Sequence, residues 1–363
     1  MPLNSALLPG MIGKMLVKNR FVRSATHEGL ADADGVYTEK LVEYLKQLAA
    51  GGVGLIITGH AYVSAAGNAG NYQASADSDA VIPAWSKMLD VLTPYGVRCV
   101  LQLAHAGAYA ANAETAIAPM AIQTSATRCP AQAASLRQLQ ELPQYFAEAA
   151  VRAREAGFHG VQIHAAHGYL ISEFLSGAYN QRTDGYGGSL EKRARLLLEI
   201  VRAVREAVGP DYPLLVKINS EDFAKNGMSN ADCAAVCKML QEKGVSAIEL
   251  SGGVPLSPAK YSTLRTKDLS VYYREAARAI RQELGIPVIL TGGVRSLRTA
   301  GELIDEKACD FVGMSRPFIR EPGIVEHWKE DGEAVSDCIS CNRCFRSILV
   351  GKGVACAKER SGK

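Results

Sequence analysis

The feature that most constrains the fold is the regular alternation of short apolar segments with longer segments of helical periodicity. Each short segment is apolar at most positions, as expected for a strand that is covered on both faces. Parallel strands require crossover connections, so this alternation predicts a parallel sheet. The predicted strands are Asn19–Thr26, Gly54–Val63, Arg98–Ala106, Gly160–Ala166, Pro213–Ser220, Ala247–Gly252, Pro287–Gly292 and Asp310–Ser315.

The intervening segments carry apolar residues three and four positions apart, which is typical of helices with one buried face. One such face is formed by Leu190, Ala194, Leu197, Val201 and Val204. That helix is expected to end at Gly209, and a shorter eighth helix is predicted over Ile324–Lys329. We therefore predict an α/β fold, a (β/α)8 TIM barrel over residues 1–325 with a short cysteine-rich C-terminal extension over residues 326–363. An open doubly wound sheet is the competing architecture.

Composition narrows the class of protein further. The 363 residues include 40 Lys and Arg and 37 Asp and Glu, a net charge of +3 that argues against a dedicated nucleic-acid surface. No apolar run approaches the ~20 residues needed to span a bilayer, so no membrane partner is expected. The first residues lack the pattern of a signal peptide, which predicts a cytoplasmic protein.

The predicted fourth strand ends in two imidazoles and a phenol. His164, His167 and Tyr169 emerge within six residues, at the strand end where a barrel places its chemistry. Imidazole N–H groups can stabilise charge on a carbonyl oxygen, and a nearby phenol can deliver a proton. A metal pair and ordinary packed histidines are the alternatives to this catalytic interpretation.

The last two strands end in residues suited to an anion. Gly292 and Gly293 let backbone N–H groups approach a phosphate, and Arg316, after Ser315, can bind its oxygens in a bidentate manner. A tight turn with a solvated arginine is the simpler alternative.

Two polar residues interrupt otherwise apolar strands. Lys217 on the fifth strand and Gln102 on the third are expensive to bury unless each has a partner. That partner is either a bound ligand or another polar group inside the barrel.

The nine cysteines fall into two groups. Five are scattered through the barrel-like segments and are expected to be small buried apolar residues: Cys99, Cys129, Cys233, Cys237 and Cys309. The other four form the pattern Cys338-x2-Cys341-x2-Cys344-x11-Cys356. Such crowding in a cytosolic enzyme suggests a [4Fe-4S] cluster, with zinc or four free thiols as alternatives.

Four blocks together resemble the Old Yellow Enzyme family, the NADH:flavin oxidoreductases, from about residue 5 to residue 325. They are Asn19-Arg20-Phe21-Val22, Leu101-Gln102-Leu103-Ala104-His105-Ala106-Gly107, His164-x2-His167-Gly168-Tyr169, and Asn180-x-Arg182-x-Asp184-x-Tyr186-Gly187-Gly188-Ser189. We interpret the last block as a loop that ion pairs lock in place, with Ser189 as the N-cap of the next helix.

The resemblance implies FMN at the carboxyl ends of the strands. Ser24, Ala25, Thr26 and His27 would line one edge of its ring, with His60 at the family's small-residue position on the second strand. Gln102 and Lys217 would meet the pyrimidine ring, and Gly293, Ser315 and Arg316 would hold the phosphate. His164 and His167 would hold the substrate's carbonyl oxygen, and Tyr169 would be the proton donor.

This chain departs from the family pattern at several positions. His27 stands where Thr or Cys is usual, Lys217 where most members carry Arg, and Ser315 where many carry Gly. Gly29 replaces a tyrosine that often contacts substrate, so we expect a more open pocket there. His27 and the cysteines resemble the branch of 2,4-dienoyl-CoA reductase and trimethylamine dehydrogenase, whose third cysteine spacing is one residue longer. That branch's flavodoxin-like domain and second nucleotide-binding domain are not expected, because the sequence stops at Lys363.

The predicted function is NAD(P)H-dependent reduction of an alkene conjugated to a carbonyl, an enone or enoyl substrate, by an FMN-dependent oxidoreductase. The electrons would come from NAD(P)H or an electron-transfer protein, and the family implies a homo-oligomer. The alternatives are an amine or dealkylating dehydrogenase of the same family, an RNA-acting flavin barrel such as a dihydrouridine synthase, and a non-enzymatic barrel whose cysteines form a docking module.

Overall fold

Eight parallel strands close into a barrel in this computed structural model, which describes residues 4–112, 114–125, 127–257 and 271–358. The barrel closes because β4 pairs with β3 on one side and with β6 on the other. The predicted barrel is therefore confirmed, and the open sheet is excluded. Its strands are β3 (Phe21–Arg23), β4 (Leu55–Ile57), β6 (Arg98–Ala104), β9 (Gly160–Ala165), β10 (Leu214–Asn219), β11 (Ala247–Ser251), β12 (Val288–Thr291) and β13 (Phe311–Met314).

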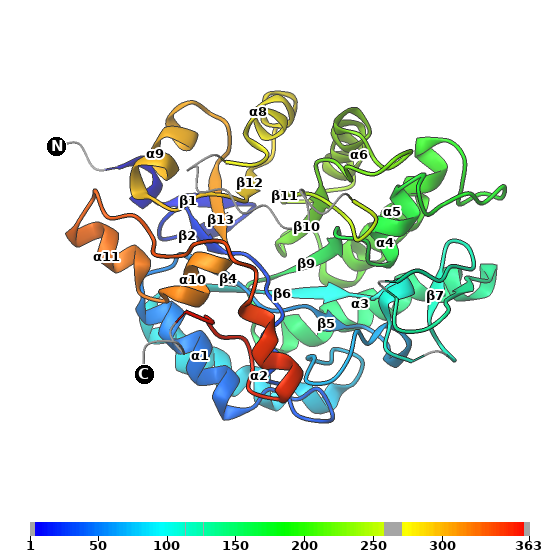
Figure 1. Ribbon diagram of the computed structural model, residues 1–363, viewed down its shortest axis with the longest axis horizontal. Helices are drawn as coiled ribbons and strands as arrows, with labels where there is room; N and C mark the ends of the chain where they lie inside the picture. Colours follow the sequence, from blue (N-terminus) through cyan, green and yellow to red (C-terminus); the bar gives the residue numbers. More distant parts are fainter. Residues whose placement is uncertain (1–3, 113, 126, 258–270, 359–363) are drawn as a thin grey trace.

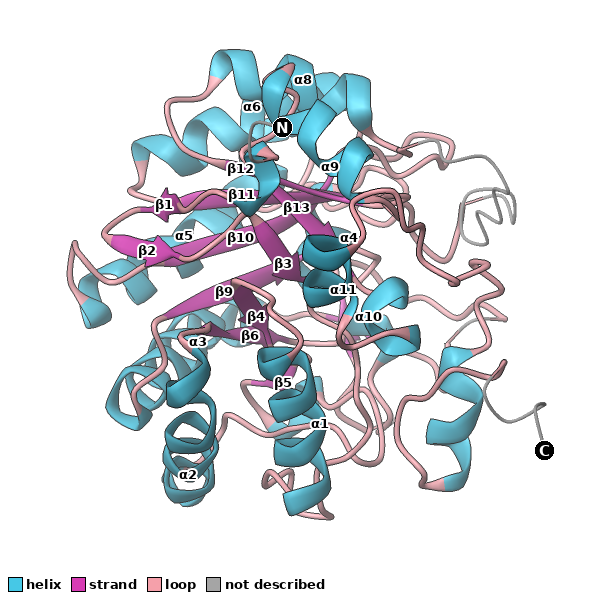
Figure 2. Cartoon of the chain, turned by 90° about the vertical axis from the view of Figure 1, so that its left-hand side faces the viewer, coloured by secondary structure: helices cyan, strands magenta, loops and turns pink. Residues whose placement is uncertain are grey.

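Helices surround the strands, as Figure 2 shows. Helix α5 buries Ala194, Leu197, Val201 and Val204 of the predicted face, while Leu190 is half-buried. The helix ends at Val208, before Gly209 with φ 85°. The helices after the barrel strands are α1 (Glu39–Ala50), α2 (Ile82–Leu92), α3 (Leu136–Ala156), α5 (Leu190–Val208), α6 (Asn230–Glu242), α8 (Arg274–Glu283), α9 (Leu297–Asp305) and α11 (Ile324–Glu330).

Two short helices that the sequence pattern did not predict follow directly on the ends of barrel strands. Helix α4 (Leu170–Leu175) begins after Tyr169, and α10 (Arg316–Arg320) begins after Ser315. Among the described residues, no helix combines the length and apolarity that crossing a bilayer requires.

The amino-terminal end of the barrel is closed by a hairpin. Its strands β1 (Gly10–Ile12) and β2 (Met15–Val17) turn at Gly13, which has a φ of 55°. Ile12, Met15 and Val17 pack against apolar side chains that fill the barrel interior at this end. At the opposite end, where the strands have their carboxyl termini, the barrel is lined by polar side chains.

Three short strands are additional to the eight barrel strands. β5 (Ala61–Tyr62) pairs with β6, and β7 (Ile117–Ala118) pairs with β8 (Gln132–Ala133) in the long segment after β6. The last described residues run past the carboxyl ends of the strands, the red trace in Figure 1, and Val354 N–H donates to the carbonyl of Glu28. The loop after β3 and the C-terminal segment therefore lie side by side.

Candidate active site at the carboxyl ends of the strands

A cavity of about 550 Å³ opens at the carboxyl ends of the barrel strands. Its described lining contains every predicted catalytic or cofactor residue except Gly293, which directly follows the lining residue Gly292. Those residues are Ser24, Ala25, Thr26, His27, His60, Gln102, His164, His167, Tyr169, Lys217, Gly292, Ser315 and Arg316. The barrel thus brings together side chains from distant parts of the chain at one mouth.

The histidines and the tyrosine after β9 form a compact cluster. The ring centroid of His164 lies 5.4 Å from that of His167 and 5.0 Å from that of Tyr169. The His167 Nε2 lies 2.8 Å from the hydroxyl of Ser251, and the backbone of His167 adopts a φ of 60°. The buried Nδ1 of His164 has no hydrogen-bond partner among the residues that the structure describes. Because such groups are costly to leave unpaired, this atom is suited to a ligand.

Burial keeps both imidazoles neutral. It lowers the pKa of His167 to about 3, with Lys217 contributing to the shift. Burial also lowers the pKa of His164 well below its usual value, with His167 and Lys217 adding to the effect. A neutral imidazole has one N–H donor, so each ring can donate to a carbonyl oxygen without carrying a charge.

The phenol of Tyr169 remains protonated. Burial raises its pKa to about 12. Its oxygen lies 3.3 Å from Nε2 of His60, whose ring stacks on His27 with centroids 5.1 Å apart. Tyr169 therefore has a proton to give at neutral pH and one polar neighbour inside the cavity wall.

Lys217 is paired within the barrel. Its Nζ lies 2.9 Å from Glu249 Oε1 and donates to the hydroxyl of Ser24 at 2.8 Å. The side chain of Glu249 is fully buried and also accepts from Thr291. Our sequence reasoning missed Glu249, although it interrupts an apolar strand just as Lys217 does.

Gln102 likewise has a partner inside the barrel. Its amide nitrogen donates to Gln162 Oε1 at 2.7 Å, and Gln162 in turn donates to Glu249 at 2.7 Å. Lys217 and Gln102 thus each have a polar partner inside the barrel. Together these side chains make a hydrogen-bonded cavity floor.

The end of the cavity near β12 and β13 is shaped by glycine and arginine. Gly292 and Gly293 have φ values of 140° and 87°, which side-chain-bearing residues rarely adopt. Arg316 donates to Asn342 at 2.6 Å and to the hydroxyl of Tyr272 at 3.3 Å. The guanidinium is therefore held at the cavity edge by its neighbours and is not a freely solvated side chain.

Two parts of the lining come from segments that the sequence did not link to the site. Asn342 and Phe345 belong to the cysteine-rich extension, and Tyr272 precedes α8. No local motif marks these residues, because only the folded chain brings them to the cavity.

The prediction that Gly29 leaves the pocket open is wrong. Gly29 has a φ of 61°, and a Cβ built there would lie 2.5 Å from Cγ2 of Ile348. The space that a larger residue would occupy is filled by the C-terminal segment, whose contact with this loop could not be read from the sequence.

The four C-terminal cysteines lie near one another. Cys338, Cys344 and Cys356 are buried, and Cys341 is half-buried. Burial, together with the other three thiols, raises the pKa of Cys344 to about 11. Within the described part of the chain, however, no three His, Cys, Asp or Glu side chains are placed to ligate one metal ion. The five other cysteines are buried, as predicted.

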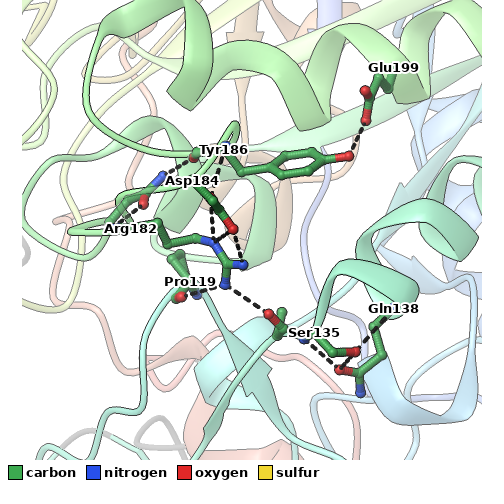
Figure 3. A network of polar contacts seen from close by, with 9 residues as sticks. Pro119, Ser135, Gln138, Arg182, Asp184, Tyr186 and Glu199 are labelled. Atoms are coloured by element: carbon green, nitrogen blue, oxygen red, sulfur yellow. Dashed lines mark hydrogen bonds and ion pairs between the residues drawn. The ribbon is translucent and has the colours of Figure 1, made fainter.

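The loop after α4 supports the site in the predicted way. Figure 3 shows Arg182 paired with Asp184, with Nη2 and Oδ2 2.6 Å apart, while Tyr186 donates to Glu199 at 2.9 Å. Arg182 also donates to the carbonyls of Pro119 and Ala134, at 3.0 and 2.7 Å. These contacts fasten the loop to the segment around β7 and β8. Ser189 occupies the N-cap position of α5, but its side chain makes no capping bond.

The cavity fits a flavin mononucleotide by its chemistry. It combines a hydrogen-bonding floor, an edge where glycines and Arg316 meet, and a buried His164 nitrogen that lacks a partner among the described residues. Its volume of about 550 Å³ lies in the range usual for cofactor sites.

Comparison with known proteins agrees with this chemistry. A model of the NADH:flavin oxidoreductase / NADH oxidase family matches residues 8–334. The chain is 35% identical to the "Metal reductase" of Desulforamulus reducens over 353 residues, 96% of this chain and 52% of that protein. It is 34% identical to an NADPH dehydrogenase of Bacillus pumilus over 316 residues, 86% of this chain and 91% of that protein.

A solved complex of 2-naphthoyl-CoA reductase with 2-naphthoyl-CoA superimposes with a TM-score of 0.91 at 26% identity. The match covers 97% of this chain and 56% of the reductase. The chain thus spans about half the length of that reductase and of the metal reductase. Because the family model matches most of its length, the chain belongs to the NADH:flavin oxidoreductase / NADH oxidase family, the family of the Old Yellow Enzymes.

Proposed function

We propose that this chain is an FMN-dependent, NAD(P)H-driven reductase of alkenes conjugated to a carbonyl. The observation that carries the proposal is the cluster after β9, where two neutral imidazoles and a protonated phenol converge. The Nδ1 of His164 in this cluster has no described hydrogen-bond partner.

Family resemblance and the cavity lining suggest how the residues divide between cofactor and substrate. Gln102 and Lys217 would hold the pyrimidine ring of FMN, and Gly293, Ser315 and Arg316 its phosphate. The remaining cofactor contacts would come from Ser24, Ala25, Thr26, His27, His60 and Gly292. When bound, FMN supplies the hydride for the β-carbon of the alkene.

His164 and His167 stabilise the negative charge that develops on the substrate's carbonyl oxygen. Each neutral N–H donor of this kind contributes about 3 kcal/mol to lowering the barrier. Tyr169 delivers its proton to the α-carbon, so the alkene gains one hydride and one proton. The high pKa of Tyr169, about 12, keeps that proton available at neutral pH.

We further propose that residues 1–325 form the FMN-binding barrel and that residues 326–363 form an extension whose four cysteines bind a [4Fe-4S] cluster. The described thiols are close together but are not arranged as ligands of one ion, so no catalytic step is assigned to the cluster. Iron and zinc analysis of anaerobically purified protein separates a cluster from a zinc site and from free thiols.

The proposed activity is tested by an anaerobic visible spectrum followed by separate half-reactions. NADH or NADPH should bleach the flavin absorbance, and cyclohexenone or a dienoyl-CoA should restore it. Tyr169→Phe should slow the second half-reaction and leave the first intact. Flavin reduction by a methylamine without turnover of any enone would favour the amine dehydrogenase instead, and colourless protein that cannot be reconstituted with FMN would exclude both.

Light scattering tests the homo-oligomer that the family implies. Salt-sensitive binding of tRNA would favour the RNA-acting alternative.

A further inference from the structure

Two polar side chains lie behind the proposed proton donor, His60 in the cavity lining and Gln73 beyond it. Nε2 of His60 faces the phenol oxygen of Tyr169 at 3.3 Å, and its Nδ1 lies 2.7 Å from the amide nitrogen of Gln73. His60 directly precedes β5, and Gln73 is followed by Ala74, whose carbonyl accepts the N–H of Tyr62 in β5. Tyr169, His60 and Gln73 therefore form a continuous chain of polar contacts.

The orientation of the Gln73 amide is fixed by two backbone groups. Its oxygen accepts the N–H of Ala69 at 2.6 Å, and its nitrogen donates to the carbonyl of His60 at 3.2 Å. A flipped amide would place nitrogen against a donor and oxygen against an acceptor, so these neighbours define which end faces the imidazole. Gln73 thus presents an N–H group to Nδ1 of His60.

A donor at this position determines where the His60 proton lies. Nδ1 must be the unprotonated, accepting nitrogen, and the single proton of the neutral ring must therefore be on Nε2. That proton points at the oxygen of Tyr169. The phenol oxygen of Tyr169 accepts this hydrogen bond from His60 Nε2. Its own proton therefore points away from His60, into the cavity.

We propose that Gln73 locks His60 as the Nε2–H tautomer and that His60 acts as a positioning residue for Tyr169. His60 keeps the phenolic proton available to the substrate and stabilises the phenolate that remains after the proton has been transferred. This inference rests on the proposed role of Tyr169 as the proton donor. It gives His60 a role in orienting the hydroxyl of Tyr169, which differs from the flavin contact implied by family resemblance.

The surroundings of His60 are consistent with a neutral ring. Burial lowers the pKa of His60 to about 3, and His27 adds to the shift. The ionisable groups that face it from the neighbouring elements are His27 after β3, His164, His167 and Tyr169 at the end of β9, and Lys217 on β10. Protonation of Nδ1 would place two donors against each other at Gln73.

The tautomer can be measured without any substrate. In the oxidised holoenzyme labelled with 15N-histidine, the His60 signal is assigned by its loss in His60→Ala. We expect a pyridine-type Nδ1 and a pyrrole-type Nε2 in the wild type. Gln73→Glu replaces the amide donor with an isosteric carboxylate, which can still accept the N–H of Ala69. The proton of His60 should then move from Nε2 to Nδ1. A pyrrole-type Nδ1 in the wild type would overturn the proposal.

The functional consequence is measured on the two half-reactions separately. His60→Ala and Gln73→Glu should each slow reoxidation of the reduced holoenzyme by cyclohexenone roughly tenfold, the size of one hydrogen bond to a developing anion. The solvent deuterium isotope effect on this step should increase, because proton transfer becomes slower. In Gln73→Glu, whose side chain lies outside the cavity lining, reduction by NAD(P)H should stay within about twofold of the wild-type rate, since no proton from Tyr169 is involved.

His159→Ala provides a matched control. The Nδ1 of His159 also accepts a hydrogen bond, from Cys99 N–H at 3.1 Å, but it lies before β9 at the opposite end of the barrel. This variant should reoxidise like the wild type. Wild-type rates and isotope effects in both His60→Ala and Gln73→Glu would refute the positioning role. Equal reoxidation rates for the wild type and Tyr169→Phe would instead refute the proposed proton donor, and the tautomer measurement would still test the lock.

Discussion

Lys217 and Glu249 lie directly opposite each other on neighbouring parallel strands, with Nζ and Oε1 2.9 Å apart. His164 is the partner of Lys217 on the other side, in β9. The ion pair is therefore part of the cavity floor, and its lysine lies on the strand next to the proposed oxygen-binding histidine. Changes to this ion pair should therefore affect the stability of the fold as well as ligand binding.

Removing the carboxylate should destabilise the protein at neutral pH. Burial by itself raises the pKa of Glu249, but Lys217 and hydrogen bonds from Ser24 and Gln162 outweigh it and lower the pKa below its usual value. Glu249→Gln should reduce the free energy of unfolding at pH 7 by about 3–5 kcal/mol, because it leaves a buried ammonium unpaired. Urea denaturation monitored by circular dichroism measures the difference.

The sign of the pH dependence follows from the lowered pKa. A carboxyl group that is more acidic in the folded state stabilises above its unfolded pKa and loses that contribution as the pH falls through its folded pKa. The wild type should therefore approach Glu249→Gln in stability below about pH 4. The double variant Lys217→Met/Glu249→Gln should recover part of the loss at pH 7. A constant gap between wild type and Glu249→Gln from pH 7 to pH 3 would contradict this account.

The paired histidines should matter for the substrate and not for holding the flavin. The double variant His164→Ala/His167→Ala removes both neutral donors, so we expect enone turnover to fall by at least about 100-fold. The visible absorbance of FMN in the gel-filtered protein should be retained. Turnover at the wild-type rate would refute the assignment of these side chains to the carbonyl oxygen.

The contact between Gly29 and Ile348 should appear as energetic coupling. Gly29→Ala forces a Cβ to within 2.5 Å of Ile348 in a backbone conformation with φ 61°, so it should cost about 1–3 kcal/mol. In an Ile348→Ala background the same change should cost less, because the clash is relieved. Thermal unfolding of the four proteins completes the cycle, and strictly additive losses would show that the two residues do not interact.

Arginine should not be replaceable by lysine in the loop after α4. Arg182→Lys keeps the charge but loses the planar group that reaches Asp184 and two carbonyls together. We expect a loss of about 2 kcal/mol or more in unfolding free energy. Arg137→Lys is the control, since the Arg137–Glu141 pair is exposed and should give no measurable change in melting temperature. Equal melting temperatures for wild type and Arg182→Lys would count against the structural role of the loop.

The sequence predicted the barrel because period and order are local properties. The apolar face of α5 and the strand ends that carry His164 and Tyr169 could be placed without any tertiary information. Lys217 and Gln102 could be identified as requiring partners, since both interrupt apolar strands. Their partners could not be identified, because the register between parallel strands is not encoded in a connecting turn.

Contacts between segments that are distant in the sequence could not be predicted either. Ile348 fills the space beside Gly29, and Asn342 holds Arg316, although more than 25 residues separate the members of each pair. The tautomer of His60 depends on Gln73, a residue that no motif marks. Each of these relationships arises from the fold, not from residue type or spacing.

The cysteine-rich extension affects how the shape of the cavity can be altered. Asn342 and Phe345 form part of the cavity wall, so two separate stretches of chain enclose the cavity. Mutations in the extension can change the shape of the cavity without altering the strand ends that carry the proposed catalytic groups. A barrel engineered without the extension would keep the strand-end residues but would lack the part of the cavity wall that Asn342 and Phe345 form.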